Sequence, residues 1–255
     1  MRSFCDISYS DLNHPLQKLD VYLPDTGDSF PVFIYFHGGG FERGDKAARK
    51  PCFEHLTNVG IAVVSANYRL YPEAKYPEFI EDSAEVVAWV KQNIDKYCRM
   101  QSLYVGGSSA GAHLSMVLCF DERWLGKYGI RPMDIQGFFH DAGQPTCHFN
   151  MLKERGIDPR RIMVDETAPM FYVGMAEEYP PMKFIVSDDD MKNRYEETML
   201  MISALRTYGH TEPEVSLQVM HGKHCAYGRM VDWDGKNVLG KLIAEFVLNW
   251  ELKRK

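Results

Sequence analysis

The chain has 255 residues, with 29 lysines and arginines against 35 aspartates and glutamates, which gives a formal charge of −6. Hydrophobic residues make up 45% and charged residues 25%, as in ordinary globular proteins, which excludes a disordered or fibrous chain. The acidic balance and the lack of any run of five basic residues argue against a nucleic-acid partner.

The composition also bears on membranes and on redox compartment. The longest apolar stretches, Pro31–Phe36 and Ile61–Ala66, are far shorter than the roughly 20 residues needed to cross a bilayer. Met1–Asp6 places an acid where a secretory signal needs its apolar stretch. The six cysteines form no Cys-x-x-Cys pair, which indicates reduced thiols. We therefore expect a cytoplasmic protein with no membrane partner, and a homodimer is compatible with the sequence.

Short β-branched or aromatic runs alternate with segments of helical periodicity, which is typical of a mostly parallel sheet covered by helices. The first two runs follow each other too closely for a connecting helix, so we expect an antiparallel N-terminal edge. The predicted strands are Ser3–Ser10, Leu19–Leu23, Val32–Phe36, Ala62–Ser65, Leu103–Gly106, Ile135–Phe139, Phe184–Ser187 and Val215–Met220.

Apolar residues at steps of three and four predict helices over Ile80–Ile94 and Leu239–Trp250. No low-complexity linker or internal repeat divides the chain, so we expect one domain over residues 1–255. The stretch from about Gly126 to Pro181 contains the Ile135 strand and then a segment rich in Pro, Met and aromatic residues. We interpret it as including a small lid or insertion.

Gly107–Gly111 has the pattern Gly-x-Ser-x-Gly, and it lies between the strand Leu103–Gly106 and a helical run, Ala112–Leu118. A strand that turns abruptly into a helix crowds the positions two residues before and after the central one, and glycine removes the colliding Cβ atoms. Ser109 would protrude above the sheet. The helix would aim its first N–H groups at an anion beside that hydroxyl.

This pattern is weak alone, because a glycine turn between strand and helix has the same appearance, but a second glycine-rich segment adds context. The strand Val32–Phe36 ends in His37-Gly38-Gly39-Gly40. Three glycines in succession can point their N–H groups at one site because no side chain blocks them. We expect Gly38 and Gly39, together with Ala110, to form an oxyanion hole, although a tight turn would also use these glycines.

Together these segments resemble a known family: the α/β-hydrolases, specifically the hormone-sensitive-lipase-like carboxylesterases and the small bacterial feruloyl and acetyl esterases. Asn67–Glu73 is similar to the family's Tyr-Arg-Leu-Ala-Pro-Glu, with Tyr71 in the alanine place. The other motifs, in the family's order, are Leu19–Pro24, His37–Phe41, Tyr76-Pro77, Asp82 before a helix, and Gly107–Gly111. The resemblance implies an α/β-hydrolase fold with an eight-stranded sheet and helices on both faces, and a serine carboxylic ester hydrolase that needs no cofactor and no metal.

A serine nucleophile needs a base and an orienting acid. The strand Phe184–Ser187 ends in three aspartates, of which the resemblance selects Asp190, with Ser187 where the family has glycine. Asp188 and Asp189 are interpreted as a solvated loop or a helix N-cap cluster. The rival acid is Asp141, which follows the predicted strand Ile135–Phe139, since some α/β-hydrolases carry the acid after that strand.

Nine histidines compete for the role of the base. His224, after the strand Val215–Met220, matches the family's loop, and His221 is its rival. A metal site formed by these two histidines is disfavoured, because Gly222 argues against the helix that would align them. Five others are interpreted as surface or helix positions: His14, His55, His113, His148 and His210.

The expected reaction is acyl transfer to Ser109, with Asp190 and His224 as its partners, on a small-molecule ester with a short-chain acyl or an aryl or sugar group. Phe41 and Tyr71 are the predicted substrate-binding residues. The remaining pocket is expected from Glu42, Arg43 and the lid residues Met163, Met170, Phe171 and Tyr172. Two alternatives stay open: an amidase or arylformamidase of the same fold, and a non-catalytic binding protein.

Overall fold

The computed structural model describes residues 1–254, in which eight strands form one sheet in the order β1-β2-β4-β3-β5-β6-β7-β8. Strand β2 is antiparallel to both β1 and β4, and every other neighbouring pair is parallel. The mostly parallel sheet with an antiparallel N-terminal edge is therefore confirmed. The strands are β1 (Arg2–Ser8), β2 (Lys18–Leu23), β3 (Ser29–Phe36), β4 (Ala62–Ala66), β5 (Arg99–Ser108), β6 (Gly137–Asp141), β7 (Met182–Asp189) and β8 (Val215–Lys223).

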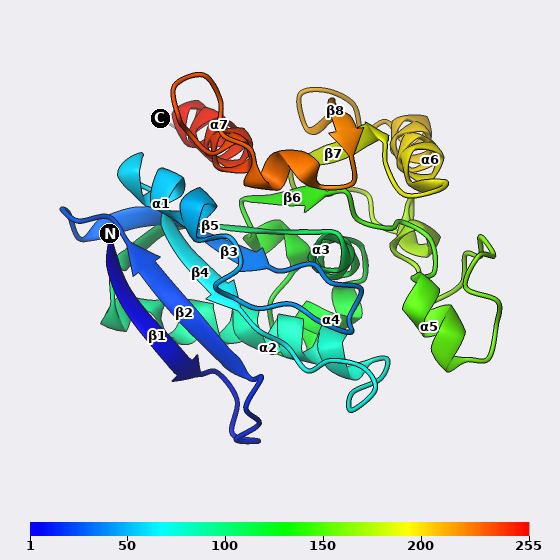
Figure 1. Ribbon diagram of the computed structural model, residues 1–255, viewed down its shortest axis with the longest axis horizontal. Helices are drawn as coiled ribbons and strands as arrows, with labels where there is room; N and C mark the ends of the chain where they lie inside the picture. Colours follow the sequence, from blue (N-terminus) through cyan, green and yellow to red (C-terminus); the bar gives the residue numbers. More distant parts are fainter. Residues whose placement is uncertain (255) are drawn as a thin grey trace.

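Helices cover both faces of the sheet (Figure 1). On one face lie α1 (Lys50–Asn58) and α7 (Val238–Lys253), and on the other α2 (Glu78–Asn93), α3 (Ala110–Phe120) and α4 (Glu122–Gly126). Two further helices, α5 (Phe149–Glu154) and α6 (Arg194–Thr207), follow β6 and β7. The predicted helix Leu239–Trp250 falls within α7 and the helical run Ala112–Leu118 within α3, whereas Ile80–Ile94 extends one residue beyond α2 into a 3₁₀ turn. None of the helices in residues 1–254 combines the length and apolar character needed to cross a bilayer.

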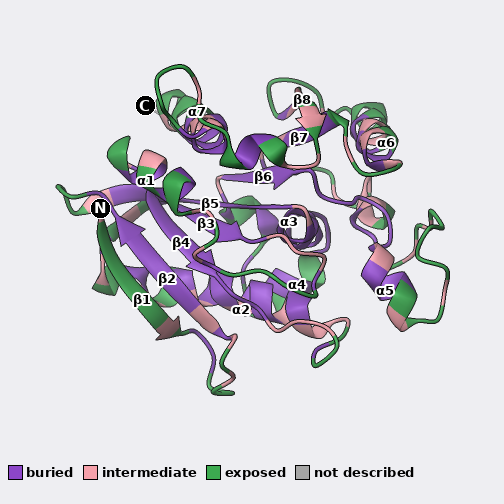
Figure 2. Cartoon of the chain, in the orientation of Figure 1, coloured by how far each residue is buried: buried purple, intermediate pink, exposed green. Residues whose placement is uncertain are grey.

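The central strands are buried on both sides (Figure 2), as expected for parallel strands between two helical layers. Side chains of β3 alternate between the two layers because successive residues of a strand point to opposite faces. Val32, Ile34 and Phe36 pack into the core with α2 and α3, whereas Phe33 and Tyr35 pack with α1 and α7.

Several strands have other boundaries than predicted, and those of β6, β7 and β8 bear on the site. Ile135 is not in a strand: its N–H donates to the carbonyl of Pro132 and closes a 3₁₀ turn, so β6 begins only at Gly137 and ends at Asp141. Strand β7 continues to Asp189 and β8 to Lys223, because the pairing between them resumes beyond a register shift. His221 and two of the three aspartates are therefore strand residues.

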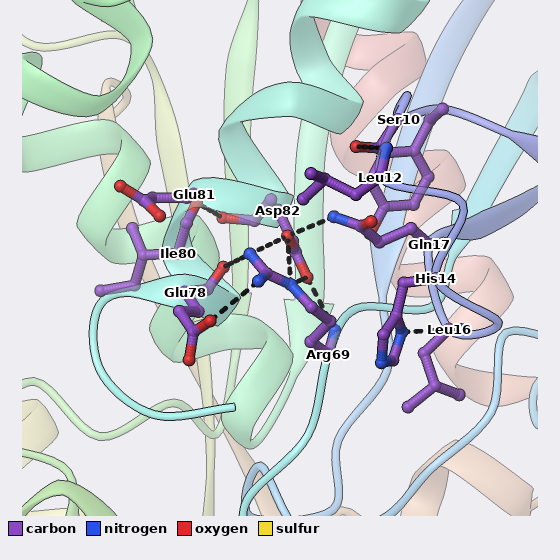
Figure 3. A network of polar contacts seen from close by, with 12 residues as sticks. Ser10, Leu12, His14, Leu16, Gln17, Arg69, Glu78, Ile80, Glu81 and Asp82 are labelled. Atoms are coloured by element: carbon purple, nitrogen blue, oxygen red, sulfur yellow. Dashed lines mark hydrogen bonds and ion pairs between the residues drawn. The ribbon is translucent and has the colours of Figure 1, made fainter. Parts of the chain in front are cut away.

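The segment after β4 is anchored to α2 by a buried ionic network (Figure 3). Arg69 donates through Nε and Nη2 to the carboxylate of Asp82, at 3.0 and 2.8 Å, and through Nη1 to Glu78. Asp82 is almost fully buried and also accepts from the side-chain amide of Gln17, at 2.8 Å. The motif Asn67–Glu73 thus contributes an anchor that joins the N-terminal hairpin, the segment after β4 and α2.

Candidate active site

Ser109 lies at the bend between β5 and α3, with φ 56° and ψ −115°. Both flanking glycines are sterically required. A Cβ atom on Gly107 would lie 2.5 Å from the carbonyl oxygen of Phe36, and one on Gly111 would lie 2.0 Å from the same atom. The N–H of Ser109 donates to the carbonyl of Asp141 at 2.7 Å, which fixes the bend to β6.

The fold brings Ser109, His224 and Asp190 together from three distant segments. Nε2 of His224 lies 2.9 Å from Oγ of Ser109, and Nδ1 of His224 lies 2.5 Å from Oδ1 of Asp190. The His224 side chain is 22% exposed, whereas that of Asp190 is fully buried. This chain of contacts couples a hydroxyl to an imidazole and the imidazole to a carboxylate, the arrangement that activates a serine nucleophile.

The Asp190 carboxylate is held in its ionised form. Burial raises its pKa, but the hydrogen bond and charge of His224, with N–H donors from Met191 at 2.7 Å and Ser187 at 3.1 Å, outweigh burial and lower the pKa overall. The departure from the family's glycine at Ser187 is accommodated, because its hydroxyl donates to the carbonyl of Lys223.

The rival residues take other partners. Asp141 is buried beneath the site, where its carboxylate accepts hydrogen bonds from the hydroxyls of Ser108 and Tyr227. Burial raises the pKa of Asp141. The exposed His221 ring pairs with Asp188 at 2.7 Å, and Lys223 pairs with Asp189. No group of three or more His, Cys, Asp or Glu side chains in residues 1–254 is placed to hold a metal ion.

The glycine loop curves over the serine. Gly39 and Gly40 have φ values of +128° and +67°, and a Cβ on Gly38 would lie 2.8 Å from the carbonyl oxygen of Ser108. Within residues 1–254, the N–H groups of Gly38, Gly39 and Ala110 have no backbone acceptor. The loop is held by His37, whose ring stacks on Tyr68 at 4.4 Å, and whose carbonyl accepts from the Tyr68 hydroxyl. These free donors can receive an anion.

A cavity of about 770 Å³ opens over this site. Of the residues predicted to form the pocket, Glu42 and Arg43 line this cavity. Its other lining residues are Tyr35, His37, Gly38, Gly39, Gly40, Gly44, Ala48, Arg49, Ser108, Ser109, Phe149, Met191, His224, Cys225, Ala226 and Arg229.

Neither predicted substrate-binding residue lines this cavity. Phe41 has a positive φ of 65°, which turns its side chain inward, where it is fully buried and stacks on Phe79 at 4.3 Å. The prediction for Phe41 is therefore wrong. Tyr71 lies outside the cavity, with its ring 5.4 Å from the ammonium group of Lys153. The backbone of Tyr71 contacts the end of the glycine loop, because the Tyr71 N–H donates to the carbonyl of Phe41 at 2.7 Å.

The other predicted pocket residues also lie elsewhere. Met170 and Tyr172 pack against the main core, and Met163 packs against a small satellite cluster around Leu152. From the predicted lid segment only Phe149 reaches the cavity. Local composition identified the segment as irregular, but it gave no signal for which aromatic ring would face the serine.

Two of the histidines interpreted as surface or helix positions are deeply buried. His113 of α3 and His148 are at most 1% exposed. Both rings pack against Phe41, at 5.9 and 4.4 Å, and Nδ1 of His113 lies 2.6 Å from the carbonyl of Gln144. Burial lowers the pKa of His113 to about 4, so the ring stays neutral inside the core.

The sequence reasoning missed Arg49, Arg229 and Phe149 as cavity residues. Arg49 immediately precedes α1 and Arg229 lies in the turn Ala226–Arg229 that follows His224. No motif surrounds either arginine. Arg229 could have been found from its proximity to His224 in the sequence, whereas nothing in the sequence pointed to Arg49.

Comparison with known proteins shows sequence similarity over part of the chain. The family model BD-FAE matches residues 19–126. Among curated proteins, the chain is 36% identical over 105 residues to Esterase LipI of Mycobacterium tuberculosis, covering 40% of this chain and 32% of that protein. It is 33% identical over 144 residues to the kynurenine formamidase of Danio rerio, covering 56% of this chain and 46% of that protein. The matched segments span about a third to a half of these relatives' length.

Solved structures match almost the whole chain. A truncated carbohydrate esterase from gut microbiota superposes with a TM-score of 0.79 at 18% identity, covering 98% of this chain and 96% of that one. Esterase B from Lactobacillus rhamnosis superposes with a TM-score of 0.77 at 17% identity, covering 98% of this chain and 85% of that one. The chain has the α/β-hydrolase fold, which confirms the fold predicted from its motifs.

Proposed function

We propose that this α/β-hydrolase-fold protein is a serine carboxylesterase that hydrolyses small esters through an acyl-enzyme intermediate. The observation that carries the proposal is the continuous contact from Ser109 through His224 to Asp190, with a cavity of about 770 Å³ above it. The kinship with proteins named esterase and carboxylesterase supports the same reaction.

In the first step Ser109 Oγ attacks the ester carbonyl while Nε2 of His224 accepts the hydroxyl proton. The 2.9 Å contact is within the range for direct proton transfer. Asp190 holds the Nδ1–H tautomer of His224 and stabilises the imidazolium that forms. The lowered pKa of Asp190 favours this role, since an ionised carboxylate is the better partner for a cation.

The tetrahedral intermediate places a negative charge on the former carbonyl oxygen. In this proposal the N–H groups of Gly38, Gly39 and Ala110 receive it, and loss of one such donor costs about 2.7–4 kcal/mol in other hydrolases. His224 then protonates the departing alcohol. Water, activated by the same histidine, releases the acid and restores Ser109.

The proposed substrates are short-chain acyl esters and esters of aryl or sugar alcohols. The cavity volume of about 770 Å³ suits such molecules, and a structural neighbour is titled a carbohydrate esterase. The proposal treats residues 1–255 as one catalytic domain, in which residues 126–181 contain the small lid or insertion. Phe149 would be that segment's contact with the substrate, because its side chain lines the cavity.

An amidase or arylformamidase is the second candidate, because two of the curated relatives are named kynurenine formamidase. The same serine chemistry cleaves both bonds, so the geometry alone favours neither substrate. Steady-state rates on phenyl acetate and acetanilide, and on phenyl formate and formanilide, separate the two functions. The proposed esterase prefers the ester in each pair.

Hydrolysis of 4-nitrophenyl acetate by the wild-type protein and by Ser109→Ala tests the proposal. The substitution should reduce kcat by roughly 10⁶-fold, since removal of a serine nucleophile leaves only background catalysis. The matched control is Ser203→Ala, an exposed serine of α6, which should keep the wild-type rate. A fluorophosphonate probe should label the wild-type protein and not Ser109→Ala. Equal rates of 4-nitrophenyl acetate hydrolysis by the wild-type protein and by Ser109→Ala would reject the proposed function.

The proposal includes a cytoplasmic location and allows a homodimer. Light scattering coupled to size-exclusion chromatography measures the mass in solution directly, against a monomer mass of 29.3 kDa.

A further inference from the structure

Three arginines line the cavity above Ser109: Arg43, Arg49 and Arg229. Within residues 1–254 none of the three forms an ion pair. The acidic residue of the same cavity wall, Glu42, is already paired with Lys153 at 2.9 Å. Elsewhere in the described residues six arginines pair with carboxylates, namely Arg69, Arg123, Arg131, Arg155, Arg160 and Arg254.

Arg49 is the most enclosed of the three. Its guanidinium lies against the backbone of Gly228, where a Cβ atom would come within 3.0 Å of Arg49 Cζ. Its Nη1 atom is buried and has no hydrogen-bond partner among the described residues. A buried donor left without an acceptor is destabilising, and the effect is larger for a charged group. A bound acceptor within reach of Nη1 would therefore be stabilised.

The buried carboxylate beneath the site does not supply that acceptor. Asp141 uses its two oxygens for the hydroxyls of Ser108 and Tyr227, and it forms no ion pair with Arg49. Arg49 remains ionised at all physiological pH values, so its charge cannot be removed by deprotonation. Arg49 and Asp141 attract each other through their charges, but Nη1 of Arg49 stays without an acceptor, which a negative group bound in the cavity would provide.

We propose that the substrate carries a carboxylate, on its acyl or its alcohol part, that binds to Arg49, while the exposed Arg43 and Arg229 in the same cavity lining add positive potential. A guanidinium fits a carboxylate through paired, charge-assisted hydrogen bonds. The inference rests on the proposed function, because it places the anion in the cavity that contains Ser109. The inference narrows the proposed substrates from small esters in general to small esters that carry a negative charge.

Two matched ester pairs test the inference and locate the anion. For the acyl side, mono-4-nitrophenyl succinate is compared with its neutral methyl ester. For the alcohol side, 4-acetoxybenzoate is compared with methyl 4-acetoxybenzoate. In at least one pair the wild-type kcat/KM for the anionic ester should exceed that for the neutral one by about tenfold or more, the effect expected of charged hydrogen bonds.

Arg49→Met should lower this anionic-to-neutral ratio by about tenfold, and Arg49→Lys should retain part of it because the charge remains. Arg206→Met is the matched control, since Arg206 is an exposed arginine of α6 outside the cavity. If Arg49→Met does not fold, Arg49→Lys and Arg229→Met give the same comparison. A wild-type ratio near one in both pairs overturns the inference, and so does a ratio that Arg49→Met leaves unchanged.

Failure of the proposed function is recognised separately. If the wild-type protein hydrolyses none of the four esters, the esterase proposal fails, and the anion inference is then decided by binding. Ser109→Ala is titrated with both members of each pair, and its Tm is measured. The inference holds if an anionic ester raises the Tm more than its neutral partner and if Arg49→Met removes that difference. The inference is overturned if both members of each pair raise the Tm equally, which is expected if only water binds next to Arg49.

Discussion

A Cβ atom on Gly111 would lie 2.0 Å from the carbonyl oxygen of Phe36, a distance that no relaxed structure tolerates. Gly111→Ala should therefore destabilise the protein by about 3 kcal/mol or shift α3 and reduce activity, since overpacking of a tight site costs about 1–3 kcal/mol or more. Urea unfolding monitored by circular dichroism measures the change.

The control for this prediction is Gly126→Ala at the end of α4, where the added methyl group meets nothing within 4 Å. Alanine favours helix over glycine by up to about 1 kcal/mol, so this variant should be as stable as the wild type or slightly more so. Equal stability of Gly111→Ala and Gly126→Ala would contradict the steric account of the bend.

Asp190→Asn should lower kcat by about 10⁴-fold with little change in KM, because an amide no longer holds the correct tautomer of His224 or stabilises its cation. Asp188→Asn is the matched control: its carboxylate contacts the exposed His221 and should lose less than about threefold. Asp141→Asn separates the rival acid. If Asp141→Asn reduces kcat more than Asp190→Asn, the assignment of the acid is wrong.

Breaking the ion pair between Arg69 and Asp82 should destabilise the protein strongly. Asp82 is 1% exposed, so Arg69→Met leaves a buried carboxylate without its cation, at a cost of about 3–5 kcal/mol. Arg160→Met is the control, since Arg160 pairs with Asp158 on an exposed surface and should cost less than about 1 kcal/mol. Chemical denaturation of both variants gives the difference, and similar losses would argue against the anchoring role of Arg69.

His140 makes stability dependent on pH in a direction that can be worked out. Burial among Phe120, Phe138 and Phe184 lowers the pKa of His140 to about 3. The unfolded chain, with a histidine pKa of about 6.5, therefore binds a proton that the folded state does not, between those two pH values. The contribution of His140 to stability is complete above about pH 6.5 and falls as the pH falls toward 3.

His140→Phe should accordingly reduce the loss of stability between pH 7 and pH 4. The ring would remain in aromatic surroundings, and Ser115, which contacts His140 Nδ1, keeps its own bond to the carbonyl of Ala112 at 2.9 Å. Unfolding midpoints in urea at several pH values measure how steeply stability changes with pH. An unchanged slope would show that His140 does not titrate on unfolding as proposed.

The sequence alone determined the architecture and the position of the nucleophile. Alternating strands and amphipathic helices specify a layered sheet, because the apolar periodicity is a local property of each segment. The glycines at 107 and 111 are likewise a local requirement: they permit one sharp bend at Ser109, and the Cβ distances explain why. The order of the motifs then predicted the fold, which the structure and its relatives share.

Only the tertiary structure decided which carboxylate and which arginines meet at the serine. Asp188, Asp189 and Asp190 are adjacent in sequence, but pairing between β7 and β8 directs the first two to His221 and Lys223 and leaves Asp190 for His224. Phe41 turns into the core and Arg49 joins the cavity because of backbone geometry and packing between distant segments. These contacts depend on long-range registration of strands and loops, which no local pattern of residues records.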